Sequence, residues 1–177
     1  GYILLYNGGS VEGISGRPSR QWKGGRDPVA IIGIDLGTTN SLVSVYRNGH
    51  AELLPNEWDE FMTPSCVGVL EDGTVTVGAV AKERLITHPE ETAASFKTWM
   101  GTQKEYILGG RRFLPQELSA LVLRKLAQSA REALGEEIEE AIISVPAYFN
   151  DQQRKATQLC HTAGSAAGGT AGQAAYQ

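Results

Sequence analysis

The sequence has few cysteines, few aromatic residues and no long apolar run, and each shortage excludes a class of protein. Its 177 residues include two cysteines, Cys66 and Cys160, which are too few for a disulfide framework and favour a reducing compartment. Aromatic residues make up 7% of the chain, and the three tryptophans are too dispersed to form a platform for stacking bases. No apolar run approaches the roughly 18 residues of a membrane span. We therefore expect a cytoplasmic protein with no membrane partner.

Positive charge is not concentrated in one part of the chain. There are 16 lysines and arginines against 20 aspartates and glutamates, for a net charge of −4. Because the basic residues are scattered and form no stripe, the sequence predicts no nucleic-acid partner. The three histidines have no metal-ligand spacing to one another or to the cysteines. A chain of this length can bury roughly 70% of its unfolded surface, so one or two modest domains can fold without a structural metal.

Glycine is unevenly distributed and marks the two ends of the chain. Of the 21 glycines, seven lie within residues 1–29 and four within residues 163–177. Neither end has a hydrophobic period, so neither is expected to bury enough surface to offset the entropy lost on ordering. We predict a disordered glycine-rich segment at 1–28, an organised region at 29–163 and a low-complexity segment at 164–177.

Within the organised region the hydrophobic pattern alternates between strand-like and helix-like. A continuous apolar run at 29–34 predicts a strand covered on both faces, and a turn at 35–39 follows it. The clearest helix is Pro115–Leu134, with proline at its first position and a glycine after its last. These elements predict a mixed α/β fold. The others are strands at 41–46 and 51–54 joined by an Asn48-Gly49 hairpin turn, strands at 64–70, 74–77 and 141–145, and helices at 79–87 and 152–162, the last capped by Asn150 or Asp151.

The turn after the first strand has the residue types of a phosphate site. Gly37 permits a close backbone approach, and Thr38 and Thr39 offer hydroxyl donors to phosphate oxygens. Asp35, at the end of the strand, is suited to holding a hydrated Mg²⁺. The alternative is a plain hairpin turn in which the two threonines satisfy turn amides. The five residues alone leave both interpretations open.

Four ordered motifs carry a more specific resemblance. They are IIGIDLGTTNSLVSVYRNG, LLPNEWDEFMTPS, VGAVAKERLITHPEETAASFKTWMG and AIISVPAYFNDQQRKAT. In this order and at these separations they resemble the start of the 70-kDa heat-shock chaperone family (DnaK-like), and the FKTWMG segment is most similar to its HscC-type branch. The resemblance covers roughly residues 29–163. It implies the first lobe of an actin-like ATPase (ribonuclease H-like) fold, with a mixed sheet and flanking helices, as part of an incomplete domain. It also implies ATP or ADP with Mg²⁺ in a cleft between two lobes.

The resemblance assigns roles to individual residues. Lys97 matches the catalytic lysine beside the terminal phosphate, whereas its position alone predicts a solvated helix residue. Pro146 and Arg154 match the pair through which the family couples nucleotide state to its substrate domain. Without the resemblance they are a strand stop and a solvated helix residue. The first phosphate loop, which contacts the nucleotide phosphates and a water-bridged Mg²⁺, matches Asp35, Gly37, Thr38, Thr39 and Asn40.

The same resemblance sets expectations for partners and activity. The parent protein would couple ATP binding and hydrolysis to the binding and folding of unfolded polypeptides in the stress response, together with co-chaperones. Because the second lobe of the cleft does not follow, we expect no efficient ATP hydrolysis by the chain alone. The alternatives are an inert or protein-binding fragment without nucleotide function, and a fragment of a carbohydrate kinase of the actin superfamily. VPAYFNDQQR and the Lys97 segment argue against the kinase.

The low-complexity segment at 164–177 suggests a hypothesis about the gene. Residues 166–173 can be back-translated so that a shift of one base encodes leucine, arginine, valine, glutamate, arginine, leucine and valine. That string resembles the strand that follows in the family. A frameshift in this segment is therefore a hypothesis that sequencing of the locus would test.

Overall fold

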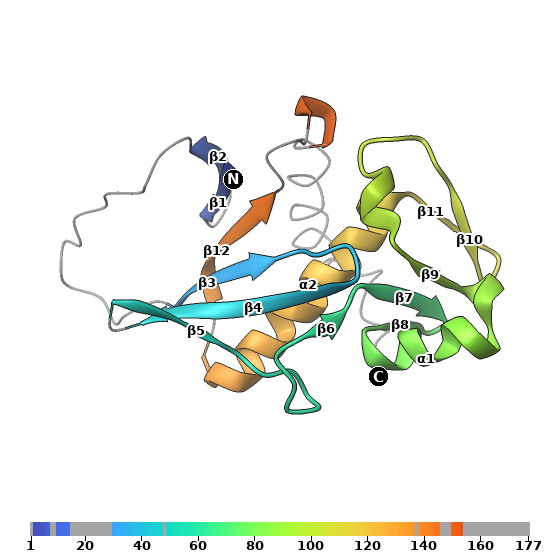
Figure 1. Ribbon diagram of the computed structural model, residues 1–177, viewed down its shortest axis with the longest axis horizontal. Helices are drawn as coiled ribbons and strands as arrows, with labels where there is room; N and C mark the ends of the chain where they lie inside the picture. The colour runs from blue at the N-terminus through green and yellow to red at the C-terminus, as the bar shows by residue number, and fades with distance from the viewer. Residues whose placement is uncertain are drawn as a thin grey trace.

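The computed structural model describes residues 2–7, 10–14, 30–47, 49–136, 138–145 and 150–153. They form a large mixed sheet, a small antiparallel sheet and a long helix that contacts both (Figure 1). The mixed α/β class predicted from the order of elements is confirmed. No helix in these ranges is long and apolar enough to cross a membrane.

The centre of the large sheet carries the candidate site. Its strand order is β2-β1-β12-β3-β4-β5. β3 (Ala30–Asp35) pairs in parallel with β12 (Ile138–Val145) and antiparallel with β4 (Asn40–Arg47), which continues into β5 (His50–Leu53) through the predicted hairpin. Burial along β3 alternates between buried and half-buried positions, so the expectation of a strand fully covered on both faces is wrong. One face packs on the core, and the other is only partly covered.

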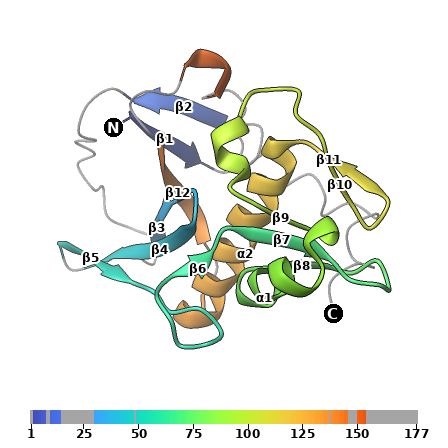
Figure 2. The same cartoon turned by 45° about the vertical axis from the view of Figure 1, so that its right-hand side comes forward.

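Two short strands extend the large sheet beyond β12. β1 (Tyr2–Asn7) pairs antiparallel with β12 and with β2 (Ser10–Ile14), and Figure 2 shows this hairpin beside β12. The structure therefore differs here from the disorder predicted for 1–28. The segment Ile3 to Tyr6 has the apolar and aromatic residues favoured in strands, and β12 offers it a row of backbone hydrogen-bonding groups. Pairing with that edge supplies partners that the sequence period alone did not reveal.

The small sheet has the order β8-β7-β9 and is covered by α1 (Ala79–Thr87). The predicted hairpin is present as β7 (Cys66–Val69) and β8 (Val75–Val77), while β9 (Thr92–Ala94) was not predicted. Cys66 is buried here, as expected of a core cysteine, and burial raises the pKa of its thiol. The remaining elements are β6 (Thr63–Pro64), which pairs with β4, the hairpin of β10 (Tyr106–Leu108) and β11 (Arg111–Phe113), and short 3-10 helices at Pro89–Glu91 and Phe96–Trp99.

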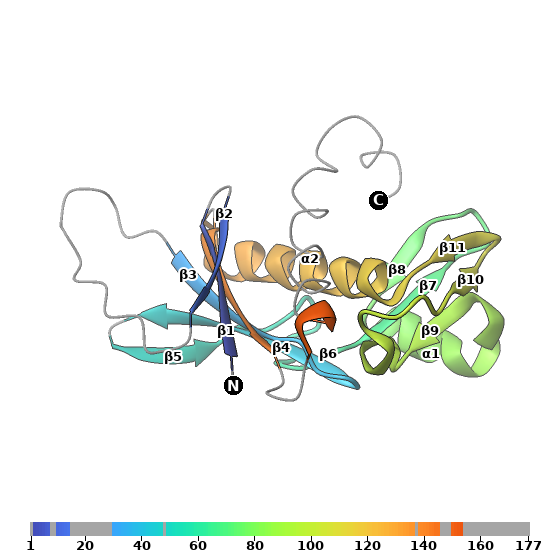
Figure 3. The same ribbon diagram turned by 90° about the horizontal axis from the view of Figure 1, so that it is seen from above.

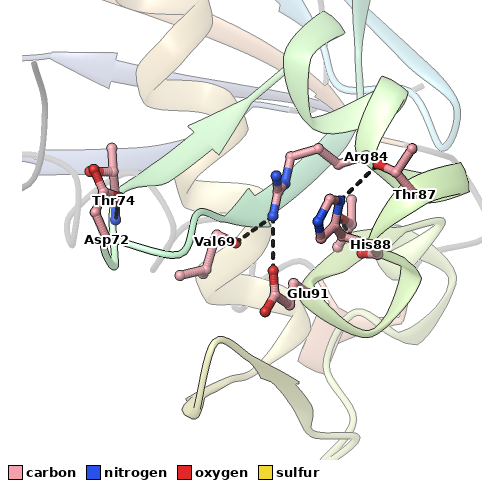
Figure 4. A network of polar contacts seen from close by, with 8 residues as sticks. Val69, Asp72, Thr74, Arg84, Thr87, His88 and Glu91 are labelled. Carbon is pink, nitrogen blue, oxygen red and sulfur yellow. Dashed lines mark hydrogen bonds and ion pairs between the residues drawn. The ribbon is translucent and has the colours of Figure 1, made fainter.

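A polar network joins α1 to the small sheet. Figure 4 shows Arg84 reaching from α1 toward Val69 and Glu91. Its Nη2 donates to Oε2 of Glu91 at 2.8 Å and to the carbonyl of Val69 at 3.4 Å. Because Glu91 belongs to the 3-10 helix that follows α1, a single guanidinium joins α1, the end of β7 and that 3-10 helix.

α2 (Pro115–Leu134) is the helix predicted from the sequence, with the same bounds. It begins with Pro115 in its first turn and a hydrogen bond from the Leu114 amide to Glu117 Oε2 at 2.7 Å. It ends at Gly135, whose φ of 67° is the left-handed conformation that glycine adopts most readily. The helix contacts β3 and β4 as well as β7 and β8, and Figure 3 shows it running between the two sheets. Its buried residues therefore belong to one continuous core with both sheets.

Candidate functional site

The predicted phosphate turn lies where two parallel strands end. Asp35 is the last residue of β3, and its register partner in β12 is Ser144. The Ser144 hydroxyl donates to Oδ1 of the exposed Asp35 at 2.9 Å. The carboxyl ends of parallel strands are the usual position of ligands in open α/β sheets. The carboxylate is thus held at the sheet edge with part of its surface open to a ligand.

Lys97 contacts this turn at Leu36. It belongs to the 3-10 helix Phe96–Trp99, it is 8% exposed, and its Nζ donates to the carbonyl oxygen of Leu36. Burial lowers the pKa of Lys97, and the negative charge of Asp35 partly offsets that effect. The alternative of a solvated helix residue is wrong. A buried cation beside a turn of this kind favours an anionic ligand at the same place.

Gly37 has a different role from the one predicted. A Cβ built at Gly37 would overlap the carbonyl oxygen of Asn40 in its own turn, so the chain itself requires glycine at this position. The Gly37 amide donates to the Ser41 hydroxyl at 3.1 Å, and the Gly37 carbonyl accepts from the Ser65 hydroxyl at 2.8 Å. Both polar groups of Gly37 are engaged within the protein. Gly37 shapes the turn, and its amide is not free to contact a phosphate.

The two threonines remain available. Thr39 is exposed and Thr38 and Asn40 are half-buried. Within the described ranges the Thr38 and Thr39 hydroxyls make no hydrogen bond, so they do not satisfy turn amides there. The Thr39 carbonyl accepts from the Ser65 amide at 2.8 Å, which fixes the backbone and leaves the hydroxyl unused. The turn therefore presents two unengaged donors next to Asp35.

Residues 150–153, which follow β12 in the chain, approach the end of the segment that carries Lys97. Asn150 and Gln153 cap the start of a helix, because each donates its backbone amide to the other's side-chain oxygen at 2.9 Å. This selects Asn150 over Asp151 as the cap. A Cβ at Gly101, just after the Lys97 helix, would lie 3.1 Å from the Gln153 amide nitrogen. The helix start and the Lys97 segment are therefore in close contact. The predicted coupling residues Pro146 and Arg154 lie outside the described residues.

Comparison with known families decides the identity of the fold. The model of the family described as Hsp70 protein matches residues 31–107 and 104–170, which together span most of the chain. The chain belongs to the Hsp70 family. Its fold is accordingly that of an actin-like ATPase, as the resemblance predicted, and the observed mixed sheet with flanking helices is consistent with an incomplete domain. The match runs to residue 170, beyond the boundary at 163 that the sequence pattern predicted.

Proteins of the Hsp70 family bind ATP or ADP with Mg²⁺ and act on unfolded polypeptides with co-chaperones. Among the described residues no three histidine, cysteine, aspartate or glutamate side chains are grouped as a metal site. A lone carboxylate such as Asp35 fits Mg²⁺, which usually keeps several waters and takes its remaining ligands from substrate phosphates. The residues of the turn thus suit a hydrated Mg²⁺ and do not form a protein-only cage.

Sequence reasoning missed three serines that hold the Hsp70 turn in place: Ser41, Ser65 and Ser144. For Ser41 a signal was present. It alternates with Val43 and Val45 on the buried face of β4, and a hydroxyl on a buried face is expected to have a partner. Ser65 and Ser144 are 24 and 109 residues away from their partners in the chain, so only the tertiary fold could reveal them.

Proposed function

We propose that this chain binds ATP or ADP with Mg²⁺ at the turn of residues 35–39. The observation that carries the proposal is the buried Lys97 beside the turn. A desolvated ammonium and two threonine hydroxyls that make no hydrogen bond within the described residues lie at the same turn. Phosphate oxygens would accept from the two hydroxyls, and their negative charge would be attracted to the ammonium.

Each predicted site residue other than Gly37, which shapes the turn, has a direct role in the proposal. Thr38, Thr39 and Asn40 would contact phosphate oxygens, and Asp35, held by Ser144, would hold Mg²⁺ through water. Mg²⁺ would neutralise phosphate charge when bound. Lys97 would place its positive charge by the terminal phosphate, where charge stabilisation and positioning supply most of the catalysis of phosphoryl transfer. Pro146 and Arg154 would couple the site to a substrate domain.

The finer assignment is also a proposal. We propose that residues 29–163 are the first lobe of the nucleotide-binding domain of a DnaK-like chaperone of the HscC-type branch, acting in the cytoplasm and in the stress response. The FKTWMG segment supports the branch, and the order of four motifs supports the lobe. Unfolded polypeptides and co-chaperones would be partners of the parent protein. The isolated lobe would bind nucleotide more readily than it hydrolyses it.

Thermal unfolding of the 177-residue chain with and without excess Mg-ADP tests the proposal. A ligand at about 100 times its dissociation constant adds about 2.7 kcal/mol to the free energy of unfolding, which would raise the melting temperature measurably. Asp35→Asn keeps an oxygen for Ser144 while removing the charge, and Thr38→Ala removes one hydroxyl. Both should reduce the shift.

A matched control is Thr74→Ala, in the tight turn between β7 and β8 and away from the site. It should keep the full shift of the unsubstituted chain. A cooperative melt that Mg-ADP does not shift would overturn the proposal and favour a protein-binding or inert fragment.

A further inference from the structure

Ser41 and Ser65 form a closed hydrogen-bond circuit with Gly37. The amide of Gly37 donates to Ser41 Oγ at 3.1 Å, the two serine oxygens lie 2.8 Å apart, and Ser65 Oγ donates to the Gly37 carbonyl at 2.8 Å. The circuit begins and ends on the same glycine. It joins β4 to the residue that follows β6, although the two serines are 24 positions apart in the chain.

The direction of every proton in the circuit follows from chemistry. An amide can only donate and a carbonyl can only accept, so Ser41 Oγ accepts from Gly37 and Ser65 Oγ donates its single proton to the Gly37 carbonyl. Ser65 must then accept from Ser41 across their shared contact. Each hydroxyl donates once and accepts once. Neither serine keeps a proton for a ligand, and a circuit in which every bond points the same way is mutually strengthening.

We infer that Ser41 and Ser65 are positioning residues that fix the turn for the ligand, through Gly37 and Thr39, without contacting it. Ser65 acts twice, since its hydroxyl holds the Gly37 carbonyl and its amide holds the Thr39 carbonyl at 2.8 Å. Thr38 lies between these two fixed carbonyls. The two serines are almost fully buried, with Ser41 and Ser65 exposed by 0% and 2%, so water cannot readily replace either hydroxyl.

The inference rests on the proposed nucleotide site for its functional consequence, but its structural half can be measured without any nucleotide. In the unliganded 177-residue chain, Ser65→Ala should increase amide hydrogen exchange at Gly37 about tenfold although Ser65 does not touch that amide, because the circuit orders Ser41. The amide of Val43, in the core of β4, reports global opening and should change less.

The control is Ser44→Ala, on β4, the strand that also carries Ser41. Ser44 also donates its hydroxyl to a glycine carbonyl, that of Gly33 at 3.4 Å, but it lies outside the turn. Ser44→Ala should leave exchange at Gly37 unchanged. Ser41→Thr, which keeps the hydroxyl and suits a strand, should retain slow exchange. Equal exchange at Gly37 in Ser65→Ala and in the unsubstituted chain would overturn the inference.

The functional half is the dissociation constant for Mg-ADP, measured by calorimetry below the melting temperature of every variant. Ser41→Ala and Ser65→Ala should each weaken binding about tenfold, and the double variant should be no weaker than either, because both break one circuit. If the unsubstituted chain does not bind, the proposed function fails while the exchange result still decides the circuit. If it binds and both serine variants bind equally well, the positioning role is refuted and the proposed function stands.

Discussion

Two serines are buried beside the phosphate turn and two in helix α2, and the two pairs differ in whether their hydroxyls are hydrogen-bonded. Ser41 and Ser65 at the turn are fully hydrogen-bonded to each other and to Gly37. Ser119 and Ser129 in α2 are equally buried, yet within the described part of the chain their hydroxyls have no partner. Serines that are equally buried can therefore differ in whether their hydroxyls have a hydrogen-bond partner.

The difference in hydrogen bonding separates two roles for a buried serine. Ser41 and Ser65 hold the backbone of the turn, whereas Ser119 and Ser129 only fill space in the core. A buried hydroxyl without a partner costs free energy, so Ser119 and Ser129 are tolerated as small side chains where α2 packs against the sheets. The hydroxyls of Ser41 and Ser65 offset their burial with three hydrogen bonds. A backbone that must present donors to a ligand within a few tenths of an ångström needs that kind of support.

The largest expected effect comes from closing the space inside the turn. Gly37→Ala should lower the free energy of unfolding by about 3 kcal/mol, because its Cβ would overlap the Asn40 carbonyl. Gly49→Ala is the matched control. Gly49 has a φ of 86° and open space around it, so only backbone strain of about 1 kcal/mol is expected. Urea unfolding measures both. Equal losses would show that the turn has room to relax.

Alanine substitutions test whether the two pairs of serines differ in their contribution to the free energy of unfolding. Ser65→Ala leaves the Ser41 proton and the Gly37 carbonyl without partners and should cost about 2 kcal/mol of unfolding free energy. Ser119→Ala removes a hydroxyl that has no partner in the described residues and should be neutral or stabilising by up to about 1 kcal/mol. Chemical denaturation of the two variants under one set of conditions decides this. A similar loss in both would remove the distinction between the two pairs.

The lowered pKa of Lys97 makes the free energy of unfolding depend on pH in a defined direction. Burial lowers the pKa of Lys97 in the folded chain, so the unfolded chain binds that proton more tightly and stability is reduced at neutral pH. The penalty disappears as pH rises from the folded pKa to the ordinary lysine value. The unfolding free energy of the unsubstituted chain minus that of Lys97→Met should therefore rise over this alkaline range. The rise should be about 1.4 kcal/mol for each pH unit that separates the two pKa values.

The control for that measurement is Val80→Met, at an exposed position of α1. It changes no titratable group, so its difference from the unsubstituted chain should stay flat over the same pH range. Tyr106 and Cys66, whose pKa values burial raises, titrate in all three proteins and cancel from the differences. A flat difference for Lys97→Met as well would mean that the ammonium is not desolvated in the folded chain.

The smallest expected effect comes from an ion pair that joins β4, which follows the phosphate turn, to the end of α2. Arg47 at the end of β4 pairs with Glu136 just after α2, and both side chains are substantially exposed. Exposed pairs contribute little and are screened by salt. Arg47→Met should cost less than about 0.5 kcal/mol at low salt and nothing measurable at high salt. A larger, salt-independent loss in thermal unfolding would show that the turn and α2 depend on this contact for their relative position.

The sequence predicted most of this fold because its strong local signals agree with the tertiary structure. The strand before the turn, the Asn48-Gly49 hairpin and the bounds of α2 all follow from local chemistry. β1 and β9 were missed because such short strands gain their hydrogen-bonding partners from strands far away in the chain. The burial of Lys97 was unexpected from its local pattern, since periodicity does not report which neighbours cover a short segment.

The candidate residues of the site stand out in the sequence, whereas the contacts that support them do not. Asp35, Thr38 and Thr39 stand out as a phosphate-binding pattern, and their availability in the structure agrees with that pattern. Gly37 was assigned to the ligand, whereas its amide, carbonyl and missing side chain all serve the turn. Such roles depend on contacts between residues far apart in the chain, which a single sequence does not show.

The most direct test of the account follows the backbone amide resonances of the 177-residue chain during titration with Mg-ADP. Binding at the proposed site should shift the Thr38, Thr39 and Lys97 amides most strongly. The Gly37 amide, which donates to Ser41, should shift less than the Thr38 and Thr39 amides. No response at the turn, or the largest shifts in the small sheet around α1, would contradict the assignment of the turn as the nucleotide phosphate site.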